Sequence, residues 1–336
     1  MATSAFSTAA AESLAETNFA ARRRLGISGY VACFKGIVWR EILRYLHQRE
    51  RFLSALVRPL IWLFIFAAGF RQTLGVSIIP PYETYVLYEE FIAPGLIAMI
   101  LLFNAMQSSL SMVYDRETGT MRTLLVSPFP RSFLLLSKLL GGVSVALLQA
   151  FAFLFVAYWW GIQPPPITEV KLFTFFDPPS WAGNVIPAMG DPIVYTLFSV
   201  PDFLQPALGY IAVVPAIVLG GLMLGALALF ISSVIKQLEN FAGVMNFVIF
   251  PMFFASSALY PLWRIREASP LLYEICRLNP FTYAVELVRF ALYGQIDTIS
   301  LAIVVACTVI FLGAAVFAYN PSKGLIARRG GPGGPA

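Results

Sequence analysis

Very few residues of this sequence have the type and spacing that catalysis or metal binding requires. The chain has one histidine, His47, and three cysteines that lie far apart, Cys33, Cys276 and Cys307. These spacings predict neither a zinc site nor a disulfide framework. The motifs HExxH and GxSxG are absent from the sequence, so no catalytic residue and no metal ligand is expected. The phosphate-binding motif GxxxxGK[ST] is also absent, and any nucleotide chemistry is therefore expected from another polypeptide.

The composition indicates a membrane protein. Of the 336 residues, 58% are hydrophobic and only 12% are charged, and the mean hydropathy is +0.75. Soluble domains are about half apolar and a quarter charged, so a soluble fold of this composition would expose large apolar areas to water. A water-soluble enzyme, a disordered protein and a disulfide-stapled secreted domain are excluded.

Six apolar stretches are long enough to cross about 30 Å of hydrocarbon, which takes roughly 20 helical residues. The predicted spans are Leu53–Phe70, Phe91–Val113, Leu134–Trp160, Leu208–Val234, Phe241–Leu259 and Ser300–Tyr319. They lack the polar–apolar alternation of barrel strands. The expected fold is therefore an all-α polytopic membrane protein with six transmembrane helices.

The charge distribution predicts the orientation of these spans. With both termini inside, only six of the 23 Lys and Arg residues lie outside, whereas 11 of the 18 acidic residues do. Because basic residues stay on the cytoplasmic side, both termini are expected there. Residues 1–30 form a polar cytoplasmic segment and residues 321–336 a Gly/Pro-rich cytoplasmic tail. No signal peptide is predicted, and the net charge of +5 is explained by membrane orientation without nucleic-acid binding.

An amphipathic helix is predicted before the first span, between Lys35 and Phe52. Arg40, Arg44, His47 and Arg51 recur every three or four residues and share one face. Such a helix lies in the membrane interface, with its arginines toward anionic lipid head groups. Two roles remain open for it, a membrane anchor alone or an anchor that also contributes to a docking surface for a cytoplasmic partner.

The cytoplasmic loop after the second span combines charge with an apolar ridge. Met121, Leu124 and Leu125 lie between the charged residues Glu117, Arg122 and Arg131. This pattern favours insertion into a groove of another protein, and an ordinary short connection is the alternative.

The same loop resembles the permease subunits of type-2 ABC exporters. The resemblance is carried by Glu117-x-Gly119-Thr120-x-Arg122, Leu124-Leu125-x-Ser127-Pro128, Arg131, Arg58-Pro59, Pro94-Gly95 and Asn279-Pro280-x-Thr282-x4-Glu286-x2-Arg289. It covers residues 31–320, which we interpret as an ABC-2 type transmembrane domain, apart from an insertion at 163–206.

The resemblance implies that transport and ATP binding belong to different chains. Residues Glu117 to Leu125 would form a coupling helix in a cleft of an ABC ATP-binding subunit, which also binds ATP and Mg, so this chain itself needs no cofactor. The expected coupling residues are Glu117, Gly119, Thr120, Arg122, Leu124, Leu125, Ser127 and Pro128. It further implies a second permease copy, as a homodimer, and the bacterial inner membrane as location.

A short helix is predicted just before the last span. Asn279 can cap this helix, Pro280 suits its first position, and Glu286 and Arg289 form an i,i+3 ion pair. The family resemblance implies that these four residues belong to a re-entrant hairpin that closes the outer end of the pathway. An interfacial helix packed on the bundle is the alternative.

Polar side chains on the spans are candidates for a transport pathway. Asn104, Gln107, Ser108 and Ser111 share one helical face, and because polar groups in lipid are costly, this face should turn into the bundle. Asn104, Gln107, Ser108 and Asn246 are the pathway candidates, with helix packing as the alternative role. No span carries a charge at its midplane, which favours an externally powered machine over an ion-driven one.

The insertion at 163–206 contains nine prolines and many aromatic residues. The prolines forbid a continuous helix. We expect an ordered outer cap that receives cargo or docks a periplasmic partner, with a tolerated long loop as the alternative.

Together with these features, the family resemblance implies the permease of an ATP-driven exporter that moves an amphipathic or lipid- or glycan-linked substrate outward. A membrane-embedded enzyme and a passive channel or scaffold are the alternatives. The missing catalytic motifs argue against the first, and the coupling-like loop has no obvious use in the second.

Overall fold

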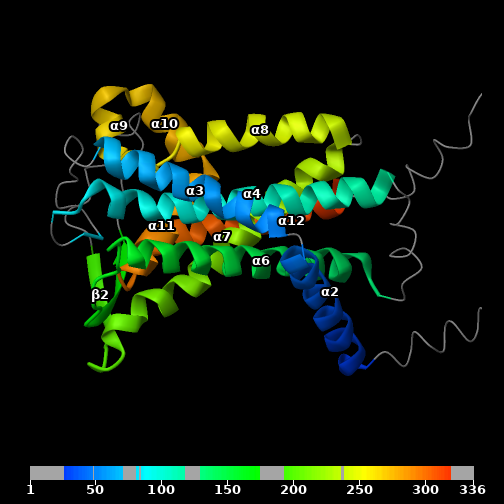
Figure 1. The fold of residues 1–336 in the computed structure, drawn as a ribbon, viewed down its shortest axis with the longest axis horizontal. Coiled ribbons are helices and arrows are strands. Elements are labelled where there is room, and N and C mark those ends of the chain that lie inside the picture. The colour runs from blue at the N-terminus through cyan, green and yellow to red at the C-terminus, as the bar shows by residue number, and fades with distance from the viewer. Residues whose placement is uncertain are drawn as a thin grey trace, which may run out of the picture.

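Long apolar helices dominate the protein, as its composition requires. The computed structural model describes residues 26–47, 49–70, 81–82, 85–117, 129–174, 193–235 and 238–318. Four helices are long and apolar enough to cross a membrane, and they run side by side along the long axis of the molecule (Figure 1). They are α4 (Tyr88–Glu117), α6 (Arg131–Trp159), α7 (Gln205–Val234) and α12 (Thr298–Ala318).

The other two predicted spans are also helical, but their apolar parts are shorter. Helix α3 (Arg49–Phe70) is apolar over Ala55–Phe66, and α8 (Leu238–Phe254) over Gly243–Phe254. Helix α8 stops at Phe254 because the chain turns through residues 255–260, which the prediction had included in the span. By length and composition, four of the described helices can thus span a membrane. The number of six spans remains a prediction.

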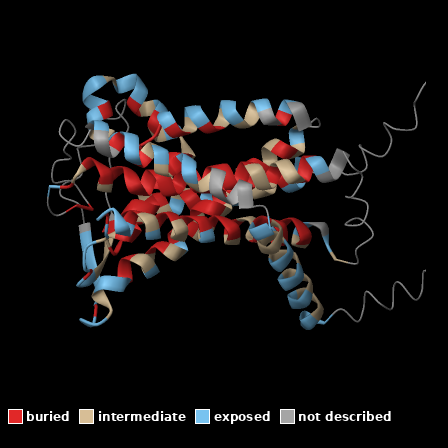
Figure 2. Cartoon of the chain, in the orientation of Figure 1, coloured by how far each residue is buried: buried red, intermediate tan, exposed pale blue. Residues whose placement is uncertain are grey.

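Helix α4 is the centre of the bundle. It packs against α3, α6, α7, α8 and α11, and its residues 91–106 are all buried (Figure 2). A close helix contact occurs at Gly95, where a Cβ atom would lie 2.7 Å from the Ala258 carbonyl oxygen and 2.9 Å from its Cα. A glycine is needed here because any side chain would collide with backbone of the turn after α8.

Three short helices connect α8 to α12. They are α9 (Leu262–Ala268), α10 (Pro270–Leu278) and α11 (Pro280–Leu292). Pro270 and Pro280 stand at the first turns of α10 and α11, where their missing N–H groups would be unpaired in any case. Helix α11 is buried along most of its length and lies among the spans, whereas α9 and α10 cap the end of the molecule (Figure 1).

The insertion contributes a small sheet that an all-α prediction did not include. Strands β1 (Glu169–Thr174) and β2 (Ile193–Ser199) pair antiparallel, and β1 pairs in parallel with β3 (Gln295–Asp297). The strand order is β2-β1-β3. Both insertion strands are rich in β-branched and aromatic residues, which favour strands, and the pairing of β1 with the distant β3 joins the insertion to the rest of the chain.

The amphipathic segment before the first span is divided between two helices. One residue separates the end of helix α2 (Ile27–His47) from Arg49, where α3 begins. Helix α2 packs against α6 and is inclined to the long helices (Figure 1). The predicted single helix from Lys35 to Phe52 is therefore wrong, and Arg51 lies on α3. The spacing of the basic residues does not reveal where one helix ends and the next begins, because they recur every three or four residues through both helices.

We predict that Gly95→Ala destabilises the protein. The added methyl group meets backbone atoms that cannot rotate away, and overpacking of this kind costs about 1–3 kcal/mol. The measurement is the thermal unfolding midpoint of the purified chain in detergent.

The matched control is Gly313→Ala in α12, where a Cβ atom meets nothing within 4 Å. This variant should unfold at or above the wild-type midpoint. Equal midpoints for the two variants would contradict the close contact between α4 and the turn after α8.

Candidate functional site

Two polar clusters interrupt the apolar bundle. We call the first, which consists of Tyr82, Ser257, Glu286 and Arg289, the sheet-end network because it lies near strand β3. The second consists of Asn104, Gln107, Ser108 and Gln149, and we call it the central cluster. The first contains two residues predicted for the outer gate, and the second contains three predicted for the pathway.

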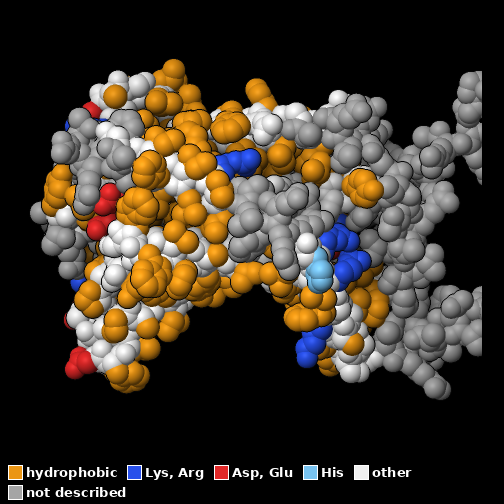
Figure 3. All heavy atoms as spheres, in the orientation of Figure 1, with side chains coloured by type: hydrophobic (Ala, Val, Ile, Leu, Met, Phe, Trp, Pro, Cys, Tyr) orange, Lys and Arg blue, Asp and Glu red, His pale blue; other side chains and the backbone are white. Residues whose placement is uncertain are grey.

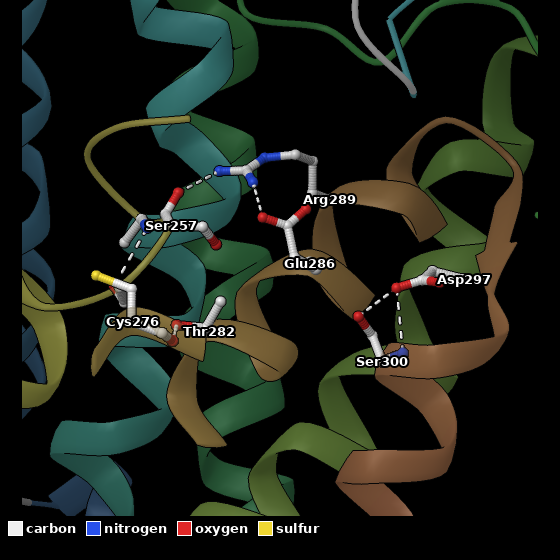
Figure 4. A network of polar contacts seen from close by, with 9 residues as sticks. Ser257, Cys276, Thr282, Glu286, Arg289, Asp297 and Ser300 are labelled. Atoms are coloured by element: carbon white, nitrogen blue, oxygen red, sulfur yellow. Dashed lines mark hydrogen bonds and ion pairs between the residues drawn. The ribbon is translucent and has the colours of Figure 1, made fainter. Parts of the chain in front are cut away.

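The sheet-end network is built around Arg289, whose side chain is 3% exposed. The guanidinium forms an ion pair with Glu286 one turn earlier on α11, as predicted, and Nη2 donates to the Ser257 carbonyl at 2.8 Å. It also lies 4.3 Å from the ring centroid of Phe91 in the first turn of α4. Figure 4 shows Arg289 reaching from α11 to the turn after α8. One buried cation thus joins three elements that are distant in sequence.

Tyr82 extends this network to the segment before α4. Its ring packs edge-on against Tyr293 at 5.0 Å between centroids, and Gln295 Nε2 donates to the carbonyl of the neighbouring Pro81 at 3.2 Å. Burial raises the pKa of the Tyr82 phenol, and the charge of Arg289 opposes this rise. The phenol therefore remains neutral, and no short-range pattern of residues predicts its position beside Arg289.

Asn279 fastens the start of α11 to the end of α8. Its side-chain oxygen accepts a hydrogen bond from Phe281 N at 3.0 Å, which is the predicted cap. Its Nδ2 donates to the carbonyls of Met252 at 2.7 Å and Ala255 at 2.6 Å. The cap was predictable from sequence, whereas the two long-range bonds were not.

Asp297 caps the start of α12 with its side chain, as Asn279 caps α11, and the sequence analysis did not identify it. Its carboxylate accepts hydrogen bonds from Ile299 N at 3.2 Å, Ser300 N at 3.1 Å and the Ser300 hydroxyl, as Figure 4 shows for Ser300. Burial raises the pKa of this carboxyl, and the bonds from Ser300 work against that rise.

The central cluster joins α4 to α6. Asn104 Nδ2 donates to the side-chain oxygen of Gln149 and to Ile100 O at 3.1 Å. Both side chains are buried, and Gln149 Nε2 has no hydrogen-bond partner among the described residues. Gln107 and Ser108 are half-buried on the same helix, as expected for a face that turns inward.

A cavity of about 50 Å³ lies beside the central cluster. Helix α4 contributes Asn104, Gln107, Ser108 and Ser111 to its lining, α6 contributes Gly142 and Val145, and α2 contributes Glu41, Arg44 and Tyr45. Three predicted pathway residues therefore share one cavity. Asn246 does not line it and lies exposed on α8.

The adjoining cavity of about 20 Å³ contains a basic residue that the sequence analysis overlooked. Lys138, which is buried, lines it together with Ser108 and Gly142. Lys138 follows the start of α6 by about two helical turns, and it is therefore near one end of the span.

Helix α2 carries two of the predicted arginines, and one of them, Arg44, lines the cavity. Arg40 and Arg44 both contact Glu41, at 3.1 and 3.7 Å, and the Glu41 side chain packs against Gly141 of α6. Glu41 explains how a basic helix docks on an apolar one, because the acid neutralises the arginines nearest to the contact. The lipid-binding role of Arg40, Arg44 and Arg51 stays a prediction.

The predicted coupling residues lie almost entirely outside the described residues. Helix α4 ends at Glu117, the first of them, and the described chain resumes at Phe129. The roles of Gly119, Thr120, Arg122, Leu124, Leu125, Ser127 and Pro128 stay predictions, as does the cytoplasmic position of residues 1–30 and 321–336.

Comparison with known proteins gives a match over most of the chain. A protein-family model described as ABC-2 type transporter matches residues 32–176 and 180–293. The chain is 27% identical over 243 residues to transport permease ycf38 of Cyanophora paradoxa, which covers 71% of this chain and 66% of that protein. Its counterpart in Porphyra purpurea is 22% identical over 267 residues, or 78% of this chain and 74% of that protein.

A shorter match concerns a bacterial protein. The chain is 36% identical over 95 residues to multidrug ABC transporter permease YbhR of Escherichia coli (strain K12), covering 28% of this chain and 26% of that protein. The chain thus spans about two thirds of the Cyanophora relative and about a quarter of the Escherichia coli one.

The geometry of the sheet-end network predicts that Arg289→Ala destabilises the protein by about 3–5 kcal/mol, because it leaves Glu286 without its cation in a buried site. Chemical unfolding in detergent measures the change. Arg264→Ala is the matched control, since Arg264 is an exposed arginine of the neighbouring α9 and should change stability by less than about 1 kcal/mol. A small effect at Arg289 would show that the ion pair does not hold α11.

Proposed function

Since the chain belongs to the ABC-2 type transporter family, we propose that it is the membrane permease of an ATP-driven exporter. It moves an amphipathic or lipid- or glycan-linked substrate outward across the bacterial inner membrane, with both termini in the cytoplasm. The permease names of its relatives support a transport subunit over an enzyme. The printed multidrug name belongs to the Escherichia coli relative alone.

The observation that carries this proposal is the polar face of α4. In a helix otherwise packed on all sides, Asn104, Gln107 and Ser108 line a cavity that also touches the amphipathic helix α2. Polar groups at membrane depth are costly unless they serve packing or a pathway, and a cavity beside them favours the pathway. The cavity of about 50 Å³ holds only water-sized groups, so passage of a substrate requires the helices to move apart.

The energy for this movement comes from a separate ABC ATP-binding subunit, which family membership implies. ATP and Mg bind that subunit, and its motion reaches the bundle through the loop that follows Glu117. Helix α4 joins this loop directly to the central cluster and then to the sheet-end network. A push at the cytoplasmic end of α4 is therefore transmitted along one helix to Phe91, whose ring centroid lies 4.3 Å from the Arg289 guanidinium.

The outer gate is assigned to α10 and α11, with Asn279, Pro280, Glu286 and Arg289 as its structural residues. The burial of α11 among the spans supports a helix that enters the membrane from the sheet end. The complex contains a second copy of the permease as a homodimer.

We predict that Glu117→Ala and Arg122→Ala weaken association with the ABC ATP-binding subunit, because both charged groups belong to the loop that enters its cleft. The measurement is the amount of ATP-binding subunit that co-purifies with the tagged permease. Arg264→Ala, which removes an exposed basic residue of α9, is the control and should co-purify normally. Export by a preparation that contains no ATP-binding subunit would refute the proposed function.

A second prediction separates packing from transport in the central cluster. Asn104→Leu leaves the Gln149 amide unpaired, which costs about 1–3 kcal/mol, whereas replacement of both residues by leucine removes both polar groups and restores most of the stability. Thermal unfolding in detergent measures both variants.

The double variant should nevertheless export poorly, because its pathway has lost two polar groups. Export is measured as ATP-dependent movement of fluorescent drugs and labelled lipids in membrane vesicles that contain the complex. Ser144→Ala is the control, since its hydroxyl donates to Leu140 O of its own helix. Wild-type export by the stable double variant would exclude the central cluster from the pathway.

A further inference from the structure

Strand β2 presents large apolar side chains to the outside along its length. Tyr195 is 60% exposed, Leu197 50% and Phe198 56%. Every residue from Val194 to Ser199 is exposed, so the described protein covers neither face of β2. As the outer strand in the order β2-β1-β3, it also has one edge without a partner strand among the described residues.

The rest of the sheet holds β2 in this exposed position. Strand β1 is fixed to the bundle by its pairing with β3, by contact of the Phe173 and Phe290 rings at 5.2 Å, and by the bond from Thr298 Oγ1 to Phe173 O at 3.3 Å. At the other end of the hairpin, Val200 N donates to Thr168 O at 2.8 Å. The exposure of β2 is therefore a feature of a well-anchored sheet.

The apolar surface of β2 continues onto the ends of two spans. On α6, Phe155 is 65% exposed and Trp159 76%, and just before α7, Phe203 is 82% exposed. Figure 3 shows hydrophobic side chains over the same region of the molecule, where β2 lies beside α7 in Figure 1. Exposed apolar faces of the spans contact lipid, and aromatic residues gather where spans leave the hydrocarbon.

From this continuity we infer that β2 is a membrane-binding strand, which lies in the interfacial layer of the bilayer at the sheet end of the bundle. Tyr195, Leu197 and Phe198 contact lipid there, and no residue of β2 carries a charge that would oppose this. The inference needs only the membrane location of the spans and does not depend on the transport function.

The backbone sets the depth of β2. A free strand edge in the hydrocarbon core would leave N–H and C=O groups without partners, which that region does not allow. In the interfacial layer, water and lipid head groups supply these partners while the aromatic rings reach the acyl chains. The exposed carboxylate of Glu169, which accepts a bond from Thr196 Oγ1 at 3.4 Å, fits the same layer.

Pairing of β2 with a strand from a second copy is disfavoured by its register. Phe198 pairs with Val170 and Thr196 with Lys171, so that Leu197 is an extra residue in the ladder. Such a bulge bends and twists the strand and makes its edge a poor template for another strand. Lipid, which needs no register, fits this surface better.

Spin labelling tests the inference in the complete complex, reconstituted in vesicles of phosphatidylethanolamine and phosphatidylglycerol. Single cysteines replace Tyr195, Leu197 or Phe198 in a background in which Cys33, Cys276 and Cys307 are alanine, and each carries a nitroxide. We expect collisions with oxygen to exceed those with the nickel–EDDA complex at all three positions. Phe155→Cys on α6 is the lipid control, and Glu267→Cys, at an exposed residue of α9, is the aqueous control.

Two outcomes would overturn the inference. A predominance of nickel–EDDA collisions at all three positions would place β2 in water. Low collision rates with both reagents would show a covering protein, and spin–spin broadening would then identify that protein as a second copy.

A second measurement uses the unsubstituted chain, so that misfolded variants cannot obscure the result. Photoreactive diazirine phospholipid is included in the same vesicles, and adducts are mapped by mass spectrometry. Adducts on residues 193–199 are expected together with adducts on the exposed end of α6. Labelling of α6 without labelling of β2 would contradict the membrane-binding strand.

Discussion

A buried cation in an apolar bundle must be satisfied by groups of its own chain, and this constraint organises the sheet end of the protein. Arg289 meets it through Glu286, the Ser257 carbonyl and the face of Phe91. Each partner belongs to a different element, so α11, the turn after α8 and the first turn of α4 are held in one arrangement. The turn after α8 then has to pass close to α4, which requires Gly95 at the contact.

The sheet depends on the same arrangement. Strand β3 follows α11 directly and pairs with β1, so the position of α11 decides where the insertion docks. Asp297 ends β3 and caps α12, and the last span is thereby set relative to the sheet. In the middle of the bundle, the uncharged side chains of Asn104 and Gln149 also have a polar partner within the chain, since they bond to each other. Their mutual bond allows a polar face to exist at membrane depth beside a cavity, which a transport pathway needs.

Local rules of sequence predicted part of this site correctly. The Asn279 cap, Pro280 in the first turn and the Glu286–Arg289 pair all follow from spacings of one to three residues, and the structure confirms them. The partners of these residues were beyond such rules. Tertiary packing alone brings polar side chains of the bundle to the Ser257 carbonyl, Tyr82 and Gln149. A pattern of residue types cannot predict which main-chain carbonyl a distant side chain will contact.

The fold shows the same division. Long apolar stretches predicted four spans well, because burial in lipid requires the same length everywhere. The sheet was missed because β1 and β3 are separated by more than a hundred residues, and the break between α2 and α3 because the arginine period runs across it. The coupling residues after Glu117 lie outside the described residues, and their roles stay predictions.

We propose that ATP bound to another chain moves this bundle around the central cluster. The most direct test places a single cysteine at Ser111, which lines the cavity, in the complete complex, with the native cysteines replaced by alanine. The rate of labelling by a water-soluble thiol reagent is measured with and without a non-hydrolysable ATP analogue. We predict that the analogue changes the labelling rate at Ser111→Cys. An unchanged rate, in a complex shown to have bound the analogue, would contradict the account.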